Sequence, residues 1–171
     1  MASIEGKRLK TVGVTKALES AAAYTAEDVL SESDTPNDGT AWIFAAVAKV
    51  NGGTGYIVKA QAICETTAVT PRLTLYLFGA TPTSELDDNA ANTALLHADL
   101  ANYVGKIDFP AMEDLGGDSE TVASPSTYGN LPLAFECASD ANDLYGILVT
   151  RDAFTNTATN DMTVRLTVEQ Y

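Results

Sequence analysis

The feature that most constrains the fold is a pair of segments, residues 56–66 and 72–78, in which apolar and polar side chains alternate. Because a strand points successive side chains to opposite faces, a period of two is typical of a half-buried β-strand. The faces predicted to be buried hold Tyr56, Val58, Ala60, Ala62 and Cys64 in the first segment, and Leu73, Leu75 and Leu77 in the second. Two such strands need a second apolar sheet to cover them, so the pattern predicts a β-sandwich.

Residues 51–55, Asn-Gly-Gly-Thr-Gly, precede the first of these strands and tolerate a positive φ. Before them, residues 42–50 are predicted to form a strand with Trp42 and Phe44 on one face. We therefore predict that residues 51–55 form a turn that returns the chain into the next strand.

Further strands are predicted at residues 10–16, 28–31, 106–109, 133–137, 144–150 and 162–168. In the first of these, Val12 and Val14 share a face that Lys10 and Lys16 are predicted to extend into solvent. Residues 93–103 are predicted to form one short helix, because their apolar residues recur at the helical spacing i, i+4, i+7. Polar composition predicts loops at residues 81–92, 110–128 and 151–161.

About eight strands with long connections predict an all-β, antiparallel sandwich with one short helix in a long connection. The connections are too long for a simple meander and favour a jelly roll, with an immunoglobulin-like sandwich as the structural alternative. A chain of 171 residues suits one domain. We predict a basic N-terminal arm at residues 1–16 and a single sandwich domain at residues 17–171.

The chain is strongly acidic, with 10 Lys and Arg residues against 23 Asp and Glu residues and a net charge of −13. Phosphate binding needs clustered basic side chains, so no nucleic-acid partner is predicted. Within the arm, the predicted partner-binding residues are Lys7, Arg8, Lys10, Val12 and Val14. The valines would add to a sheet edge of a neighbouring protein, and the basic side chains would meet an acidic surface. The alternative is an arm that is disordered or paired within its own chain.

No catalytic site is predicted. His97 is the sole histidine, and Asp99 lies on a different side of the predicted helix, so the chain offers no Ser/His/Asp arrangement. Asp87, Asp88 and Asn89 offer oxygen atoms to Ca²⁺ but lack the spacing of an EF-hand loop, and a solvated loop is predicted instead. The sequence thus predicts no enzyme, no cofactor and no metal.

Cys64 and Cys137 are predicted to be two buried, reduced thiols, with a disulfide between them as the alternative. The first residues lack the apolar segment of a secretory signal, and no apolar run is long enough to span a bilayer. We therefore expect synthesis in the cytoplasm and no membrane partner.

Three aromatic residues, Trp42, Tyr56 and Tyr76, offer the rings that a sugar-binding platform requires. Trp42 and Tyr56 fall on faces predicted to be buried, so core packing is their predicted role. A glycan-binding module would need two exposed aromatic side chains on one face. The loops around Asp87 and Asp140 leave Ca²⁺ or glycan binding open as alternatives.

Five segments carry a resemblance to a known group: GTAWIF (39–44), GTGYIVKA (53–60), TPRLTLYLF (70–78), DNAAN (88–92) and YVGKIDF (103–109). They are similar to small virion structural proteins of tailed bacteriophages, and the similarity covers residues 24–171. The resemblance implies a jelly roll and a capsid decoration, or cement, protein on the outside of the head lattice. It places the protein on the virion surface, with the major capsid protein or another virion protein as partner. A head-fibre or tail-fibre component, or a module that binds glycans or a host surface, is the alternative.

The faces predicted to point outward also carry apolar side chains, namely Ile57, Ile63, Tyr76 and Phe78. These exceed what a monomeric sandwich exposes. Together with the resemblance, they predict a homo-oligomer, specifically a trimer.

Overall fold

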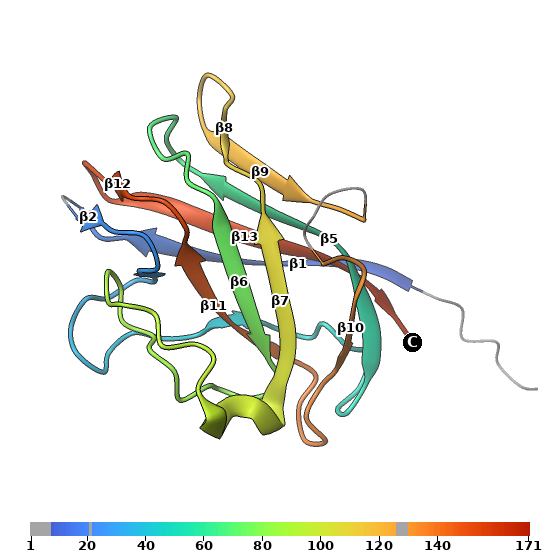
Figure 1. Cartoon of the computed structure of the whole chain (residues 1–171). Helices are drawn as coiled ribbons and strands as arrows, with labels where there is room; N and C mark the ends of the chain where they lie inside the picture. The colour runs from blue at the N-terminus through green and yellow to red at the C-terminus, as the bar shows by residue number, and fades with distance from the viewer. Residues whose placement is uncertain (1–7, 21, 126–129) are drawn as a thin grey trace, which may run out of the picture.

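The computed structural model describes residues 8–20, 22–125 and 130–171. Its strands build two antiparallel sheets that pack face to face, with the short helix η1 (His97–Asn102) at one end of the sandwich (Figure 1). The predicted all-β antiparallel sandwich is confirmed, while the jelly-roll order of the connections stays a prediction. Among the described residues, no helix is long and apolar enough to cross a membrane.

The first sheet contains β1 (Arg8–Leu18), β5 (Thr54–Cys64), β8 (Glu113–Asp114), β9 (Ser119–Ala123), β10 (Leu133–Glu136) and β13 (Asn160–Gln170). Its order is β1-β13-β5-β9-β8, and β10 also pairs with β5. The second sheet contains β3 (Val29–Leu30), β4 (Trp42–Phe44), β6 (Leu73–Phe78), β7 (Tyr103–Phe109) and β11 (Leu144–Thr150). Its order is β3-β11-β6-β7, and β4 also pairs with β11, which is the central strand predicted at residues 144–150. The short strands β2 (Ala23–Tyr24) and β12 (Phe154–Thr155) pair separately.

The main core lies between the two sheets. The inward side chains of β6 are fully buried, as predicted, and so are those of β13, where the predicted strand alternates in the same way: Leu73, Leu75, Leu77, Met162, Val164, Leu166 and Val168. Burying one aliphatic side chain of this size stabilises a fold by about 1.5–3 kcal/mol, so these two strands supply much of the driving force.

The predicted face assignment is wrong at the start of β5, because a β-bulge interrupts its pairing with β13. The register shifts between Lys59 and Ile57 and leaves Val58 as the extra residue. The alternation therefore changes face at Val58, so that Ile57 is fully buried and Tyr56 is 42% exposed. Tyr56 lies on the outer surface and not in the core.

A second, smaller core covers the outer face of the second sheet. Phe78 and Ile147 belong to this cluster and not to the main core, and both are buried. The long connection between β6 and β7 packs Leu86 and Leu95 against them. Phe78, which was predicted to face outward, is thus covered by the chain itself.

The strand predicted at residues 42–50 ends at Phe44, and Ala46 has a positive φ of 53° that breaks the extended backbone. Trp42 and Phe44 are buried, as predicted. β4 pairs with β11 in the second sheet, whereas β5 belongs to the first. Residues 51–55 therefore carry the chain from one sheet to the other and close no hairpin.

Residues 110–128, predicted to be a loop, contain β8 and β9. The inward positions of β9 include Ser119 and Thr121, whose hydroxyl groups donate to the carbonyl oxygens of Val69 (2.6 Å) and Pro110 (2.8 Å). Because their hydrogen bonds are satisfied, these small polar side chains can be buried. The strand therefore shows no alternation of apolar and polar residues in the sequence. The predicted helix at 93–103 is also shorter than expected, since η1 is a 3₁₀ helix of 6 residues.

The described part of the predicted arm is a strand of the sandwich. β1 is 11 residues long and pairs along its whole length with β13 of the same chain. The domain boundary predicted between residues 16 and 17 therefore falls inside a strand and is corrected: the described residues form one sandwich. Lys7 lies outside the described residues.

Candidate functional site

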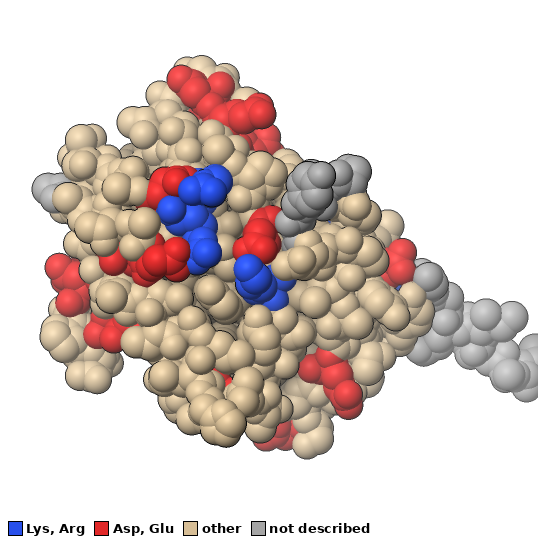
Figure 2. Space-filling model, viewed as in Figure 1, with Lys and Arg blue, Asp and Glu red and all other residues tan. Residues whose placement is uncertain are grey.

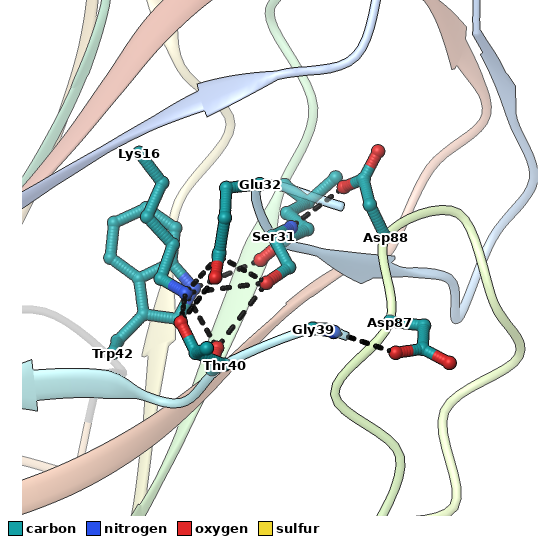
Figure 3. A network of polar contacts seen from close by, with 9 residues as sticks. Lys16, Ser31, Glu32, Gly39, Thr40, Trp42, Asp87 and Asp88 are labelled. Atoms are coloured by element: carbon teal, nitrogen blue, oxygen red, sulfur yellow. Dashed lines mark hydrogen bonds and ion pairs between the residues drawn. The ribbon is translucent and has the colours of Figure 1, made fainter. Parts of the chain in front are cut away.

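Lys16 lies at the centre of a buried polar network between β1 and the loop that follows β3 (Figure 3). Its ammonium group donates to Glu32, to Ser31 Oγ at 3.3 Å, and to the carbonyl and hydroxyl oxygens of Thr40 at 2.5 and 2.8 Å. The same nitrogen lies 5.6 Å from the centroid of the Trp42 ring, which adds a cation–π contact. Lys16 was predicted to extend into solvent, but it is 7% exposed and fastens β1 to the sandwich.

Two aspartates fasten the connection between β6 and β7 to the same region (Figure 3). Asp88 is 2% exposed and accepts hydrogen bonds of 2.6 Å from the Tyr24 hydroxyl and from the Ser31 N–H. Asp87 accepts the N–H of Gly39 at 2.8 Å. The loop predicted to be solvated is therefore pinned in place, and the oxygen atoms that Ca²⁺ would need already accept the chain's own donors.

The buried Asp88 and the half-buried Glu32 have carboxylate pKa values shifted in opposite directions. Burial raises the pKa of Asp88 to about 6, although hydrogen bonds from Tyr24 and Ser31 oppose the shift. Burial also acts to raise the pKa of Glu32, but hydrogen bonds from Lys16 and two hydroxyl groups outweigh it and lower this pKa to about 2. Stability therefore depends on pH in two opposite ways.

We expect the free energy of unfolding to be greatest at about pH 4–5. The pKa of Asp88 is raised above its ordinary 3.8, so stability increases as the pH falls through 6, by about 2–3 kcal/mol in all. The pKa of Glu32 is lowered below its ordinary 4.5, so its contribution is complete above pH 4.5 and is lost as the pH falls toward 2.

Urea unfolding at a series of pH values measures this profile. The substitution Asp88→Asn should remove the increase below pH 7 and keep the loss below pH 4.5, since the amide can still bond both neighbours. If the free energy of unfolding of the unchanged chain decreased steadily as the pH was lowered from 7 to 5, the assignment to Asp88 would be wrong.

The residues predicted to bind a partner do not form one exposed surface. Val12 is buried in the main core, and Val14 packs against that core. Lys10 Nζ donates to the carbonyl oxygen of Ala46 at 2.6 Å, whereas Arg8 is exposed. A partner of β1 therefore meets the backbone edge and outer face of the strand, and not these inward side chains.

Basic side chains on the face shown in Figure 2 are set among acidic ones. The ion pairs found at the ends and edge of the second sheet are Arg72–Asp152, Arg151–Glu27 and Lys106–Asp108. Since each of these cations has a carboxylate partner, the group is not a basic patch for binding phosphate.

His97 and Asp99 do not form a catalytic pair. Asp99 is 3% exposed and accepts four hydrogen bonds of 2.6–2.9 Å from the backbone N–H and hydroxyl groups of Thr83 and Ser84. His97 is exposed at the start of η1. Asp99 therefore anchors the beginning of the long connection.

A groove of about 800 Å³ opens where β10 of the first sheet meets β7 and η1. We call it the Tyr56 groove, and its lining includes Thr54, Tyr56, Asn102, Tyr103, Glu136 and Tyr171. Tyr56 and Tyr171 are 42% and 46% exposed, and their rings meet edge to face with centroids 5.9 Å apart. Two exposed aromatic side chains thus lie on one face, as a glycan-binding module requires. Sequence reasoning placed Tyr56 in the core and overlooked Tyr171, because the bulge that turns Tyr56 outward leaves no mark in the residue pattern.

Cys64 and Cys137 are buried, as predicted, and both thiols are free. Burial raises the pKa of each thiol to about 11, which makes them unreactive. In residues 8–20, 22–125 and 130–171, no group of three or more His, Cys, Asp and Glu side chains is placed to hold a metal. We expect neither a chelator nor a reductant to change the melting temperature in thermal denaturation. A fall of many degrees with either reagent would contradict this expectation.

Comparison with protein-family models and with curated proteins finds no match. Two surfaces therefore carry the functional argument: the outer edge of β1 and the Tyr56 groove.

Proposed function

We propose that the protein is a non-enzymatic virion structural protein that decorates the outer head lattice of a tailed bacteriophage, and that it attaches through the outer edge of β1. The observation that carries the proposal is an edge strand of 11 residues that no lysine protects. The resemblance of residues 24–171 to small phage virion proteins supports the same assignment.

Exposed strand edges invite pairing with other chains, and sheets commonly protect them with outward-pointing lysines. In β1 both lysines point into the sandwich, where Lys10 bonds Ala46 and Lys16 bonds Glu32. The outer positions of β1 between its ends are uncharged: Leu9, Thr11, Gly13 and Thr15. Within the described part of the chain, β1 pairs with β13 alone, so its other edge is available.

β1 is also held in place by hydrogen bonds to β13, so its edge is already formed before a partner binds. Hydroxyl groups of β1 and β13 bond each other across the outer face, Thr11 with Thr167 at 3.2 Å and Thr15 with Thr163 at 2.7 Å. Because this edge is already ordered, less conformational entropy is lost when a further strand pairs with it. The added strand gains main-chain hydrogen bonds. The capsid protein would supply that strand.

The test is attachment of the protein to heads assembled without it. In the double variant Thr11→Lys and Thr15→Lys, two lysines stand on the outer positions of the edge strand, and we expect affinity for the heads to fall about tenfold or more. The matched control is Thr163→Lys with Thr167→Lys, which adds the same charge to the neighbouring strand, away from the edge. Its affinity should stay close to that of the unchanged chain.

Two results would count against the proposal. If the unchanged protein does not attach to such heads, the decoration function is wrong. If it attaches and both double variants attach equally well, attachment does not use the edge of β1. Circular dichroism of each variant establishes that the sandwich is intact.

A trimer remains part of this proposal, although fewer outward apolar side chains support it than the sequence predicted. Ile57 lies in the main core and Phe78 in the second core, which leaves Ile63 and Tyr76 as the partly exposed members of the original four. We expect sedimentation velocity at micromolar concentration to show a trimer. A single monomeric species would overturn this expectation.

A further inference from the structure

We propose that the Tyr56 groove binds a neutral oligosaccharide, stacked on the rings of Tyr56 and Tyr171. This inference does not depend on the decoration function, because the groove and the free edge of β1 are different surfaces. It follows from the placement of the two rings, from the polar groups around them, and from the charge of the lining.

The outward turn of Tyr56 is built into the sheet. The bulge at Val58 reverses the face of the strand, so the ring stands on the outer surface of β5. Its cross-strand neighbour on β10 is Ala134, whose single methyl group covers little of the ring. On its other side lies Glu169 of β13. An aromatic ring held by a sheet and left 42% exposed offers a rigid apolar platform.

Tyr171 completes the platform. Its ring meets that of Tyr56 at an interplanar angle of 74°, so the two rings form a corner instead of covering each other. Its hydroxyl group donates to Glu169 Oε2 at 3.2 Å, and its backbone N–H donates to the Thr54 carbonyl at 3.2 Å. These contacts hold the ring at the mouth of the groove.

The polar groups of the groove can form hydrogen bonds with the hydroxyl groups of a sugar. Glu136 offers carboxylate acceptors, Asn102 offers an amide that both donates and accepts, and Thr54 offers a hydroxyl group. Thr54 and Glu136 are cross-strand partners beside Tyr56 and Ala134, and both are exposed. A saccharide has an apolar ring face and a rim of hydroxyl groups, so rings flanked by such groups match both parts.

The charge and shape of the groove narrow the ligand class. None of the described residues that line it is lysine or arginine, which disfavours phosphorylated, sulfated or sialylated sugars. Its volume of about 800 Å³ lies in the usual range of small-molecule sites. The competing occupant is an extended peptide that adds to β10, which within the described residues pairs with β5 alone.

The test is titration calorimetry of the full chain with three neutral tetrasaccharides: cellotetraose, maltotetraose and tetra-N-acetylchitotetraose. We expect at least one of them to bind. Tyr56→Ala should weaken that binding about tenfold, whereas Tyr56→Phe, which keeps the ring, should bind within about threefold of the unchanged chain. The matched control is Leu115→Ala, which removes a side chain that is 59% exposed outside the groove and should leave binding unchanged.

Failure of all three sugars to bind at about 10 mM overturns the proposal and leaves the groove to a peptide. Binding that is equally strong in Tyr56→Ala, with the melting temperature retained, overturns the assignment to this groove. Neither result bears on attachment to heads, so failure here and failure of the decoration function are distinguishable.

Discussion

Replacing Lys16 with methionine is expected to lower the free energy of unfolding by about 3 kcal/mol. Methionine keeps most of the aliphatic stem but removes the four hydrogen bonds of the ammonium group. Glu32 and the Thr40 carbonyl then lose a charged donor in a partly buried site, where water replaces it only in part. The contact with the Trp42 ring is lost as well. Urea unfolding followed by the fluorescence of Trp42, the only tryptophan, measures the change.

Two further variants distinguish the loss of this network from the general effect of removing a positive charge. Lys59→Met removes an exposed lysine from β5 and should change the free energy of unfolding by less than about 0.5 kcal/mol. Adding Glu32→Gln to Lys16→Met removes the carboxylate left without its partner, so part of the lost stability should return. If Lys16→Met were as stable as Lys59→Met, the network would not hold β1 to the sandwich.

Strands with unbroken alternation were predictable from the sequence. β6 and β13 bury the side chains that their period of two indicates, because periodicity reports strand geometry locally. The start of β5 was not predictable in the same way. Ile57 and Val58 are both β-branched and apolar, so either suits a core position. The choice between them depends on the register against β13, which is set far along the chain.

The buried polar network could not be predicted because its members are distant in sequence. Lys16 meets Glu32 across 16 residues, and Asp88 meets Ser31 across 57 residues. A lysine at the end of an alternating face is ordinarily solvated, and a run of acidic residues in a loop equally so. Only tertiary structure supplies the partners that make their burial favourable.

The two candidate surfaces were also predictable only where they depend on local sequence. The basic and apolar residues of β1 were identified as a possible contact region, but the sequence does not reveal that Lys10 and Lys16 turn inward. The Tyr56 groove was not predicted at all. Tyr56 and Tyr171 are brought together by the pairing of β5 with β13. The groove is also lined by residues of η1 and of β7, which belongs to the second sheet.

Replacing Gly39 with alanine is expected to destabilise the fold by about 3 kcal/mol. An added Cβ at this position would clash with the backbone of the connection between β6 and β7, including the Leu86 carbonyl, and would lie 2.6 Å from the Cα of Asp87. Backbone atoms cannot move aside by changing a rotamer. The connection must therefore shift, which strains the bond from the Gly39 N–H to Asp87 and the neighbouring contacts of Asp88.

Urea unfolding and amide hydrogen exchange together test this expectation. Exchange should accelerate at the Asp88 and Asn89 amides, which donate to the carbonyl oxygens of Ser33 and Val29, because these bonds hold the connection in place. Gly117→Ala is the matched control, since an added Cβ there meets nothing within 4 Å and should change stability by less than about 0.5 kcal/mol. Equal stability of the two variants would mean that the connection does not pack against Gly39. Loss of stability without faster exchange at Asp88 and Asn89 would place the strain elsewhere in the sandwich.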